Sequence, residues 1–530
     1  MDHTNPVKPV KVAGNHILYI NSGVAMSCCS CHPTRREFIS LAAAGTAAMG
    51  LAGAGSAWAG KAVPEWDPSQ PLLTLGKPLT VQPVLMYIES EPVPQRSYKS
   101  WGGIQRDHHA EQEIERITAE LDSIAKKAEF DITFKPVKKA KTPEQAAQIH
   151  QGDHDVVLVY AARGGGHLLR ACFSPDRHTV VFVRHRSGPV YYWYEALSTR
   201  YLETDVINAD SDTKSHVHVD DAVVDDLDEL LWRFRALYGV KNLLGTRIVA
   251  LGGAWGKRSP DAPRLCQHRF GMEIIDVPYE DLAKRISSAQ KDPKWRKKSQ
   301  TWTTQFLAMP HTSLETERAF VENAFLLYAI FKDIMQEHDT QAFTIKDCMA
   351  TVMPMSETTA CLTLGLLNDE GLIAFCESDF VVIPPGILLR HISGKPVFMH
   401  NSTFPHNGIV TCAHCSAPRR MDGDRYEPMR VVTHYESEYG AAPKVEIPVS
   451  QQVSFLNPEY ATSRWVGMKG EVVDNPFLEI CRSQQDVKIH GDWKKLINEV
   501  RDSHWMMVYG DYIRECGYAS RKLGMRWETV

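Results

Sequence analysis

The C-terminal third of the sequence places acidic and imidazole side chains within apolar surroundings. Glu377 and Asp379 follow the apolar run Leu-Ile-Ala-Phe-Cys, so a carboxylate comes directly after a predicted strand. That position suits a site at a strand end, although a single acid there is by default a buried ion pair or an exposed turn. Further polar residues in this part of the chain are His400, Asn401, His414 and His504. This region therefore holds the strongest candidates for chemistry.

Three other motifs carry weaker signals. The segment 162–167 (ARGGGH) could present backbone N–H groups to a ligand, but it is neither GxGxxG nor a P-loop, so a tight turn is favoured. The segment 412–415 (CAHC) could be a metal knuckle or a redox pair, but the absence of a second CxxC at finger-like spacing argues against structural zinc. His216 and His218 stand beside two aspartates, where a solvated acidic loop is favoured over a metal site.

The elements that position these residues follow a strand-helix rhythm in the first two thirds. A helix at 111–128 carries a stripe of isoleucine and leucine. Continuous β-branched runs, typical of buried parallel strands, predict strands at 155–160 and 179–183, and further strands are predicted at 84–88, 246–251 and 272–277. Further helices are predicted at 226–238, 279–286 and 314–335.

After residue 343 the pattern changes to strand-like runs such as 380–383 and 396–399, mixed with turns and short helices at 359–367 and 511–523. We therefore expect an α/β protein with two doubly wound, Rossmann-like domains followed by a β-rich C-terminal domain. The expected boundaries are a leader at 1–59, a linker at 60–80, α/β domains at 81–242 and 243–342, and the β-rich domain with the metal site at 343–530.

The order of several motifs resembles the L-fucose/L-arabinose isomerase superfamily. The C-terminal motifs are LLNDEGLIAFCESD, SGKPVFMHN, IVTCAHCSAP, EICRSQQDVKIHGDW and SHWMMVYGDY. Upstream, GTRIVALGGAWGKRSPDAPRLCQHRFGMEIIDVPYEDLAKRI resembles the second domain of those proteins. The resemblance covers about residues 80–530 and is clearest from 245 onward.

The resemblance implies an aldose-ketose isomerase that uses a divalent metal, often Mn²⁺. Two acidic ligands and a distant histidine hold the ion, which gathers the carbonyl and hydroxyl oxygens of the sugar. A carboxylate then moves a proton between C1 and C2 through an enediol. This chemistry needs oxygen-rich ligands with open positions and a base placed on a carbon acid.

Carried over residue by residue, the resemblance assigns Glu377 as the first acidic ligand and His504 as the late histidine. Asn401 stands where the second acidic ligand is expected, and it can donate a neutral oxygen but cannot act as a base. Asp379 would share a face with Glu377 on a strand and could compensate for the missing carboxylate as a second catalytic residue. One ion can bridge Glu377 and His504 only if they lie within about 10 Å of each other.

Three further residues are predicted to contact a substrate or metal. His400 and His414 are candidates from the C-terminal motifs. Trp101 is a plausible aromatic wall for a sugar, possible also across a subunit interface, although a tryptophan in the protein core is an equal alternative.

The N-terminus predicts export. Arg35 and Arg36 are followed by Phe38, an apolar run rich in Ala and Gly, and the small-x-small site ending at Ala59. Paired arginines before such a run indicate a twin-arginine (Tat) signal peptide, and hence the Tat translocase as a partner and a periplasmic location. A membrane anchor is the weaker alternative, because the run ends in a processing site rather than a basic flank. Met26 could be the true start.

Composition limits the remaining partners. The net charge of -5 and the absence of a basic block argue against nucleic acid. Nine cysteines follow the leader, an odd number scattered over a large chain, so we expect free, buried thiols rather than a disulfide framework.

Two functions remain open. The first is an exported, metal-dependent sugar isomerase, assembled as a symmetric homo-oligomer. The alternative is a non-catalytic, carbohydrate-binding descendant of the same fold, for which the change to Asn401 would be an early sign. A different reaction at the 412–415 cluster is a third, weaker possibility.

Overall fold

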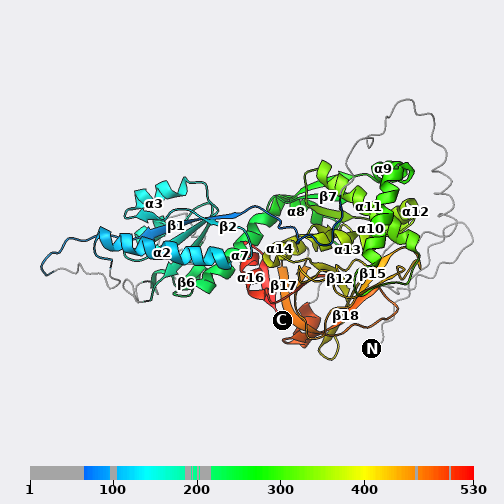
Figure 1. Cartoon of the computed structure of the whole chain (residues 1–530). Coiled ribbons are helices and arrows are strands. Elements are labelled where there is room, and N and C mark those ends of the chain that lie inside the picture. The colour runs from blue at the N-terminus through cyan, green and yellow to red at the C-terminus, as the bar shows by residue number, and fades with distance from the viewer. Residues whose placement is uncertain are drawn as a thin grey trace, which may run out of the picture.

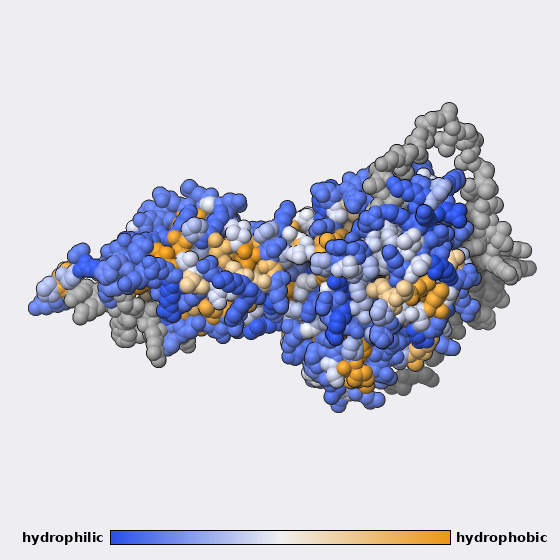
Figure 2. Space-filling view, in the orientation of Figure 1, coloured by the Kyte–Doolittle hydropathy of each residue, from blue (hydrophilic) through white to orange (hydrophobic). Residues whose placement is uncertain are grey.

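The computed structural model describes residues 65–95, 104–185, 193, 195–199, 202, 217–459, 464–499 and 503–530. Within them the protein is mixed α/β, with two parallel sheets followed by an antiparallel C-terminal region. The N-terminal α/β region projects from a larger body (Figure 1). The visible face of the molecule is mostly hydrophilic, with small separate hydrophobic patches (Figure 2). None of the helices in the described ranges has the length and hydropathy required to cross a membrane.

The first parallel sheet has the strand order β2-β1-β4-β5-β6, with β3 also pairing with β1. Its strands are β1 (Leu79–Met86), β2 (Ile132–Phe134), β3 (Lys138–Ala140), β4 (Val156–Ala161), β5 (His178–Val183) and β6 (Ala222–Val224). Its helices are α2 (Asp107–Lys127), α3 (Pro143–His150), α4 (Gly166–Ala171) and α7 (Leu227–Leu243). Every residue of β4 is buried, as its β-branched sequence predicts for a strand covered on both faces.

The second parallel sheet has the order β11-β10-β7-β8. Its strands are β7 (Arg247–Leu251), β8 (Glu273–Val277), β10 (Ala342–Ile345) and β11 (Ile373–Phe375). The surrounding helices are α8 (Ala262–Phe270), α9 (Tyr279–Lys291), α10 (Pro293–Leu307), α11 (Arg318–Glu337), η3 (Cys348–Val352), α12 (Met353–Ser356) and α13 (Cys361–Glu370). The expected domain boundary at 342/343 falls inside β10, so this sheet takes its edge strand from the segment predicted to be β-rich.

Six antiparallel strands close into a cylinder in the C-terminal region, because β16 pairs with both β19 and β17. In spatial order they are β16 (Gln452–Glu459), β19 (His504–Tyr509), β12 (Phe398–Ser402), β13 (Ile409–His414), β18 (Ser483–His490) and β17 (Arg464–Asp474). A seventh strand, β20 (Arg526–Thr529), runs parallel to β17. The β-rich prediction for this region is confirmed.

The strand predicted at 380–383 is wrong. These residues form a turn that leads into α14 (Ile383–Ser393), a helix in which every residue is buried. Pro384 and Pro385 occupy its first turn, where the missing N–H groups would have no partner in the helix anyway. A short apolar run cannot distinguish a buried strand from a buried helix by its periodicity.

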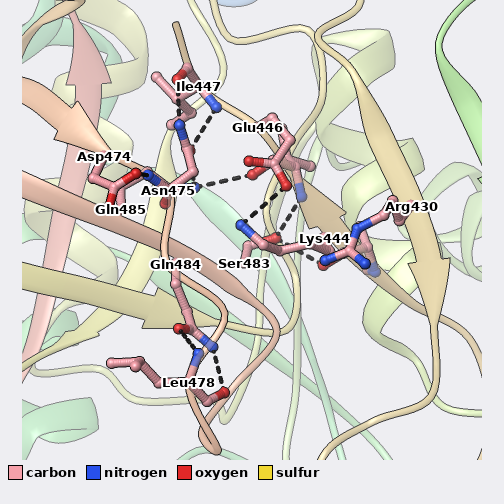
Figure 3. Close-up of polar contacts among 12 residues, drawn as sticks. Arg430, Lys444, Glu446, Ile447, Asp474, Asn475, Leu478, Ser483, Gln484 and Gln485 are labelled. Carbon is pink, nitrogen blue, oxygen red and sulfur yellow. Dashed lines mark hydrogen bonds and ion pairs between the residues drawn. The ribbon is translucent and has the colours of Figure 1, made fainter. Parts of the chain in front are cut away.

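A small sheet of β9 (Thr312–Leu314), β14 (Met429–Val432) and β15 (Ala442–Val445) is fixed to the cylinder by side chains of β18. The Ser483 hydroxyl donates to the Pro443 carbonyl at 2.7 Å, and Gln485 donates to the Val445 carbonyl at 3.0 Å (Figure 3). Beside them Lys444 is fully buried and pairs with Glu446 at 3.3 Å (Figure 3). Because β18 pairs with β13, this contact also steadies the strand that carries His414.

The N-terminal region joins the body through α7 and α16 (Ile513–Lys522), which lie together at the junction in Figure 1. Asp221, buried at the end of the first sheet, accepts hydrogen bonds from the Tyr518 hydroxyl at 2.5 Å and the Lys522 ammonium at 2.6 Å. This buried ionic contact fixes α16 against the N-terminal region.

Candidate active site

Glu377 lies in a turn after the carboxyl end of β11. The strand ends at Phe375, and Glu377 (φ 65°) and Ser378 (φ 48°) both have left-handed backbone angles. The prediction that Glu377 and Asp379 share one face of a strand is therefore wrong. Instead, the left-handed turn at Glu377 and Ser378 places the two carboxylates at different ring nitrogens of His504.

The Glu377 carboxylate contacts two imidazole rings that come from the cylinder. Its Oε2 lies 3.3 Å from Nε2 of His504, the first residue of β19. Its Oε1 lies 3.6 Å from Nε2 of His414, the last residue of β13. The requirement that Glu377 and His504 lie within reach of one ion is met. The structure adds His414, which the sequence placed only as a further candidate.

Asp379 orients His504 rather than facing an open site. It is fully buried, and its Oδ2 lies 2.7 Å from His504 Nδ1. Its Oδ1 accepts the backbone N–H groups of Lys257 at 2.9 Å and Val381 at 3.1 Å. With these three contacts the carboxylate holds the ring and fixes the loop that contains Lys257.

Charges within this group shift the pKa values of both partners. Burial alone raises the pKa of the Glu377 carboxyl, but the charges of His504, His414 and Lys257 and a hydrogen bond to His414 outweigh it and leave the pKa lowered. Burial lowers the pKa of His504, but the charge of Glu377 and the hydrogen bond and charge of Asp379 outweigh it and leave the pKa raised. Each of the two shifts therefore favours the charged form of its own group.

Asn401 lies next to this group through the backbone. In the antiparallel register it is opposite His504 on one side and Ala413, the neighbour of His414, on the other. It is half-buried. Its assignment as a metal ligand stays a prediction.

His400 lies in an aromatic layer of the cylinder. The ring is fully buried and lies 5.5 to 6.0 Å from the ring centroids of Phe398, Phe455 and Trp505. Burial lowers its pKa to about 3, so it is neutral. Its substrate-binding role stays a prediction. The predicted substrate residue Trp101 and the signal residues Arg35, Arg36 and Ala59 all lie outside the described residues.

Sequence reasoning missed Lys257, which joins the group from the loop after β7. Its ammonium donates to the Ser503 hydroxyl at 2.9 Å and lies 3.4 Å from His504 Nε2. A signal was present, because the segment GGAWGK directly follows a predicted strand of the same parallel sheet as β11. The carboxyl ends of parallel strands meet at one edge of a sheet, so side chains that follow such strands are candidates for a shared site.

Two of the weaker motifs lie within the described residues, whereas His216 of the third lies outside them. In the segment 162–167, residues 162–165 form the connection after β4, and Gly166 and His167 begin α4; the Arg163 guanidinium donates to the Ser90 hydroxyl at 2.8 Å. Cys415 lies in a small buried cluster with Cys361 and Cys481. The nine cysteines of the described part of the chain are free and buried, as predicted.

The donor set around Glu377 fits a first-row divalent ion. Across the described ranges, no three or more His, Cys, Asp or Glu side chains are already arranged to hold one. However, His504 and His414 each direct Nε2 at the same carboxylate, while Asp379 and the Ser416 hydroxyl (2.9 Å) hold their Nδ1 atoms. Fixing the second ring nitrogen in this way is how proteins orient metal-binding histidines. One carboxylate with two imidazoles suits first-row divalent ions in general, Fe²⁺ and Zn²⁺ as well as Mn²⁺, and binding would require the direct carboxylate-imidazole contacts to open.

Access to the group is narrow. The Glu377 side chain is 13% exposed, whereas His504 is fully buried. Two cavities, of about 440 and 420 Å³, lie beside α16 near the N-terminal region and include none of the residues around Glu377. We place the candidate site at Glu377 because there one carboxylate faces two imidazole rings, each held by a second side chain.

No protein-family model matches the chain, and neither does any curated protein.

Ser378 stores backbone strain next to Glu377. It is fully buried, has φ 48°, and its hydroxyl has no hydrogen-bond partner. We expect S378G to raise the free energy of unfolding by about 1 kcal/mol, because relief of the left-handed strain and of the unpaired hydroxyl exceeds the added entropy of the unfolded chain. Urea unfolding measures this, with S378A as the control that removes only the hydroxyl. A glycine variant less stable than S378A would contradict the role of strain.

Proposed function

We propose that the chain is a sugar isomerase-like protein that interconverts an aldose and a ketose through an enediol, with Glu377 as the base. The supporting observation is the convergence of His504 Nε2 and His414 Nε2 on one carboxylate, each ring held from behind by a second side chain. The resemblance to the isomerase superfamily supplies the reaction class.

Each residue of the group has its own part in the proposed reaction. The lowered pKa of Glu377 keeps it ionised, as a base that takes a proton from the carbon next to a carbonyl must be. Glu377, His414 and His504 would hold a divalent ion, which when bound polarises the carbonyl and hydroxyl oxygens of the sugar. Asp379 fixes the tautomer of His504, and low exposure of the group limits competing water.

The test combines metal binding with proton exchange. Purified protein is titrated with Mn²⁺ and then incubated in D₂O with pentoses and 6-deoxyhexoses. We expect about one Mn²⁺ per chain and deuterium incorporation at C2 or C1, seen by NMR, together with formation of the isomeric sugar. Stoichiometric metal with no exchange for any sugar would contradict catalysis, and sugar binding by calorimetry in that protein would favour the carbohydrate-binding alternative.

Three further proposals concern the location, the assembly and the finer fold class of the protein. Tat export to the periplasm, assembly as a homo-oligomer, and the doubly wound, Rossmann-like nature of the two parallel-sheet regions stay predictions. The first depends on Arg35, Arg36 and Ala59, which the structure does not describe.

A further inference from the structure

Lys257 is held against the ring nitrogen that a metal would need. Its ammonium lies 3.4 Å from His504 Nε2 and donates to the Ser503 hydroxyl at 2.9 Å. Its backbone N–H donates to Asp379, the same carboxylate that holds the other nitrogen of the His504 ring. One buried acid therefore positions both the ring and the lysine beside it.

We propose that Lys257 competes with the metal for this site: its ammonium occupies the space beside His504 Nε2 and must withdraw when a divalent ion binds. This inference rests on the proposed function and adds a competitor for its metal. Lys257 is then a positioning residue that sets how tightly the site holds its ion.

The Lys257 ammonium lies so close to His504 Nε2 that its charge would repel an ion bound there. An ion bound about 2.1 Å from Nε2 can lie no farther than about 5.5 Å from the ammonium in its present place. Like charges at such a distance in a buried site repel strongly. The ammonium also helps to balance the carboxylates of Glu377 and Asp379, a role that a bound divalent ion would take over.

The loop allows the ammonium to leave without moving the backbone. Gly252 (φ 78°) and Gly253 (φ 94°) turn the chain after β7, and Asp379 anchors the Lys257 N–H. Lys257 itself is half-buried, and its four-carbon stem is flexible. The side chain can therefore swing toward solvent while its backbone stays bonded.

The test compares Mn²⁺ affinity, measured by calorimetry, in the full chain and in K257M. We expect K257M to bind Mn²⁺ at least about tenfold more tightly, because the repelling charge is gone. K257Q, which keeps a hydrogen-bond donor without the charge, should behave alike. K294M, which removes an exposed lysine of α10, should bind as the unaltered protein does.

The outcomes separate the two proposals. Equal affinity in the unaltered protein, K257M and K257Q would overturn the role of Lys257 and leave the metal site standing. Weaker binding in both variants, with unchanged urea midpoints, would also overturn it, because it would make Lys257 a supporter of the ion. Absence of Mn²⁺ binding in every protein would overturn the metal in the proposed function and this inference with it.

Discussion

In E377Q, Mn²⁺ affinity is expected to fall by at least about 100-fold and sugar proton exchange to disappear. The amide keeps the size of the side chain, but it has neither the charge to hold a cation nor the basicity to take a proton. Even residues that only orient metal ligands change affinity about 10- to 100-fold, so loss of the carboxylate facing both rings should cost at least as much. Calorimetry and the D₂O exchange assay measure the two losses.

Glu427 provides a matched control for this substitution. It is also a buried carboxylate, and it accepts a hydrogen bond from the Tyr509 hydroxyl at 3.3 Å. E427Q should therefore leave Mn²⁺ affinity within about twofold of the unaltered protein. If E377Q instead bound Mn²⁺ normally, the ion would have to lie elsewhere and the assignment of Glu377 would fail.

The parallel-sheet elements could be predicted because local sequence decides them. The run at 155–160 is continuously apolar and β-branched, and the structure buries all of β4, shifted by one residue. The stripe on α2 likewise buries Ile117, Leu121 and Ile124. The segment 380–383 failed because its helical state depends on the prolines and on burial of α14 between other elements, which periodicity does not encode.

The candidate site was only partly predictable for a related reason. Glu377 and His504 came from the resemblance, since nothing in local sequence joins residues so far apart. His414 was recognised as polar within an apolar run, but its contact with Glu377 depends on the pairing of β13 with β12 and β18. Lys257 was missed because its place depends on the order of β7, β10 and β11 in the second sheet.

Replacement of Asp379 is expected to damage the site and the fold to different extents, according to the substituent. In D379N the amide oxygen can still accept from Lys257 and Val381, but its NH₂ group faces His504 Nδ1, which also donates. The ring must then carry its proton on Nε2, where a metal ligand needs a lone pair. We expect a 10- to 100-fold loss of Mn²⁺ affinity and a loss of about 3 kcal/mol in the free energy of unfolding.

D379A separates orientation from structural support. It leaves the Lys257 and Val381 N–H groups without their acceptor and opens a space beside a fully buried ring, so the free energy of unfolding should fall by more than about 4 kcal/mol. Urea unfolding ranks the two variants, and ¹⁵N chemical shifts of the imidazole report the tautomer of His504 in D379N. Normal Mn²⁺ affinity in D379N with Nε2 protonated would show that His504 is not a ligand. Normal affinity with Nδ1 still protonated would show that the ring needs no acceptor behind it, because the fold of β19 alone would then hold it in place.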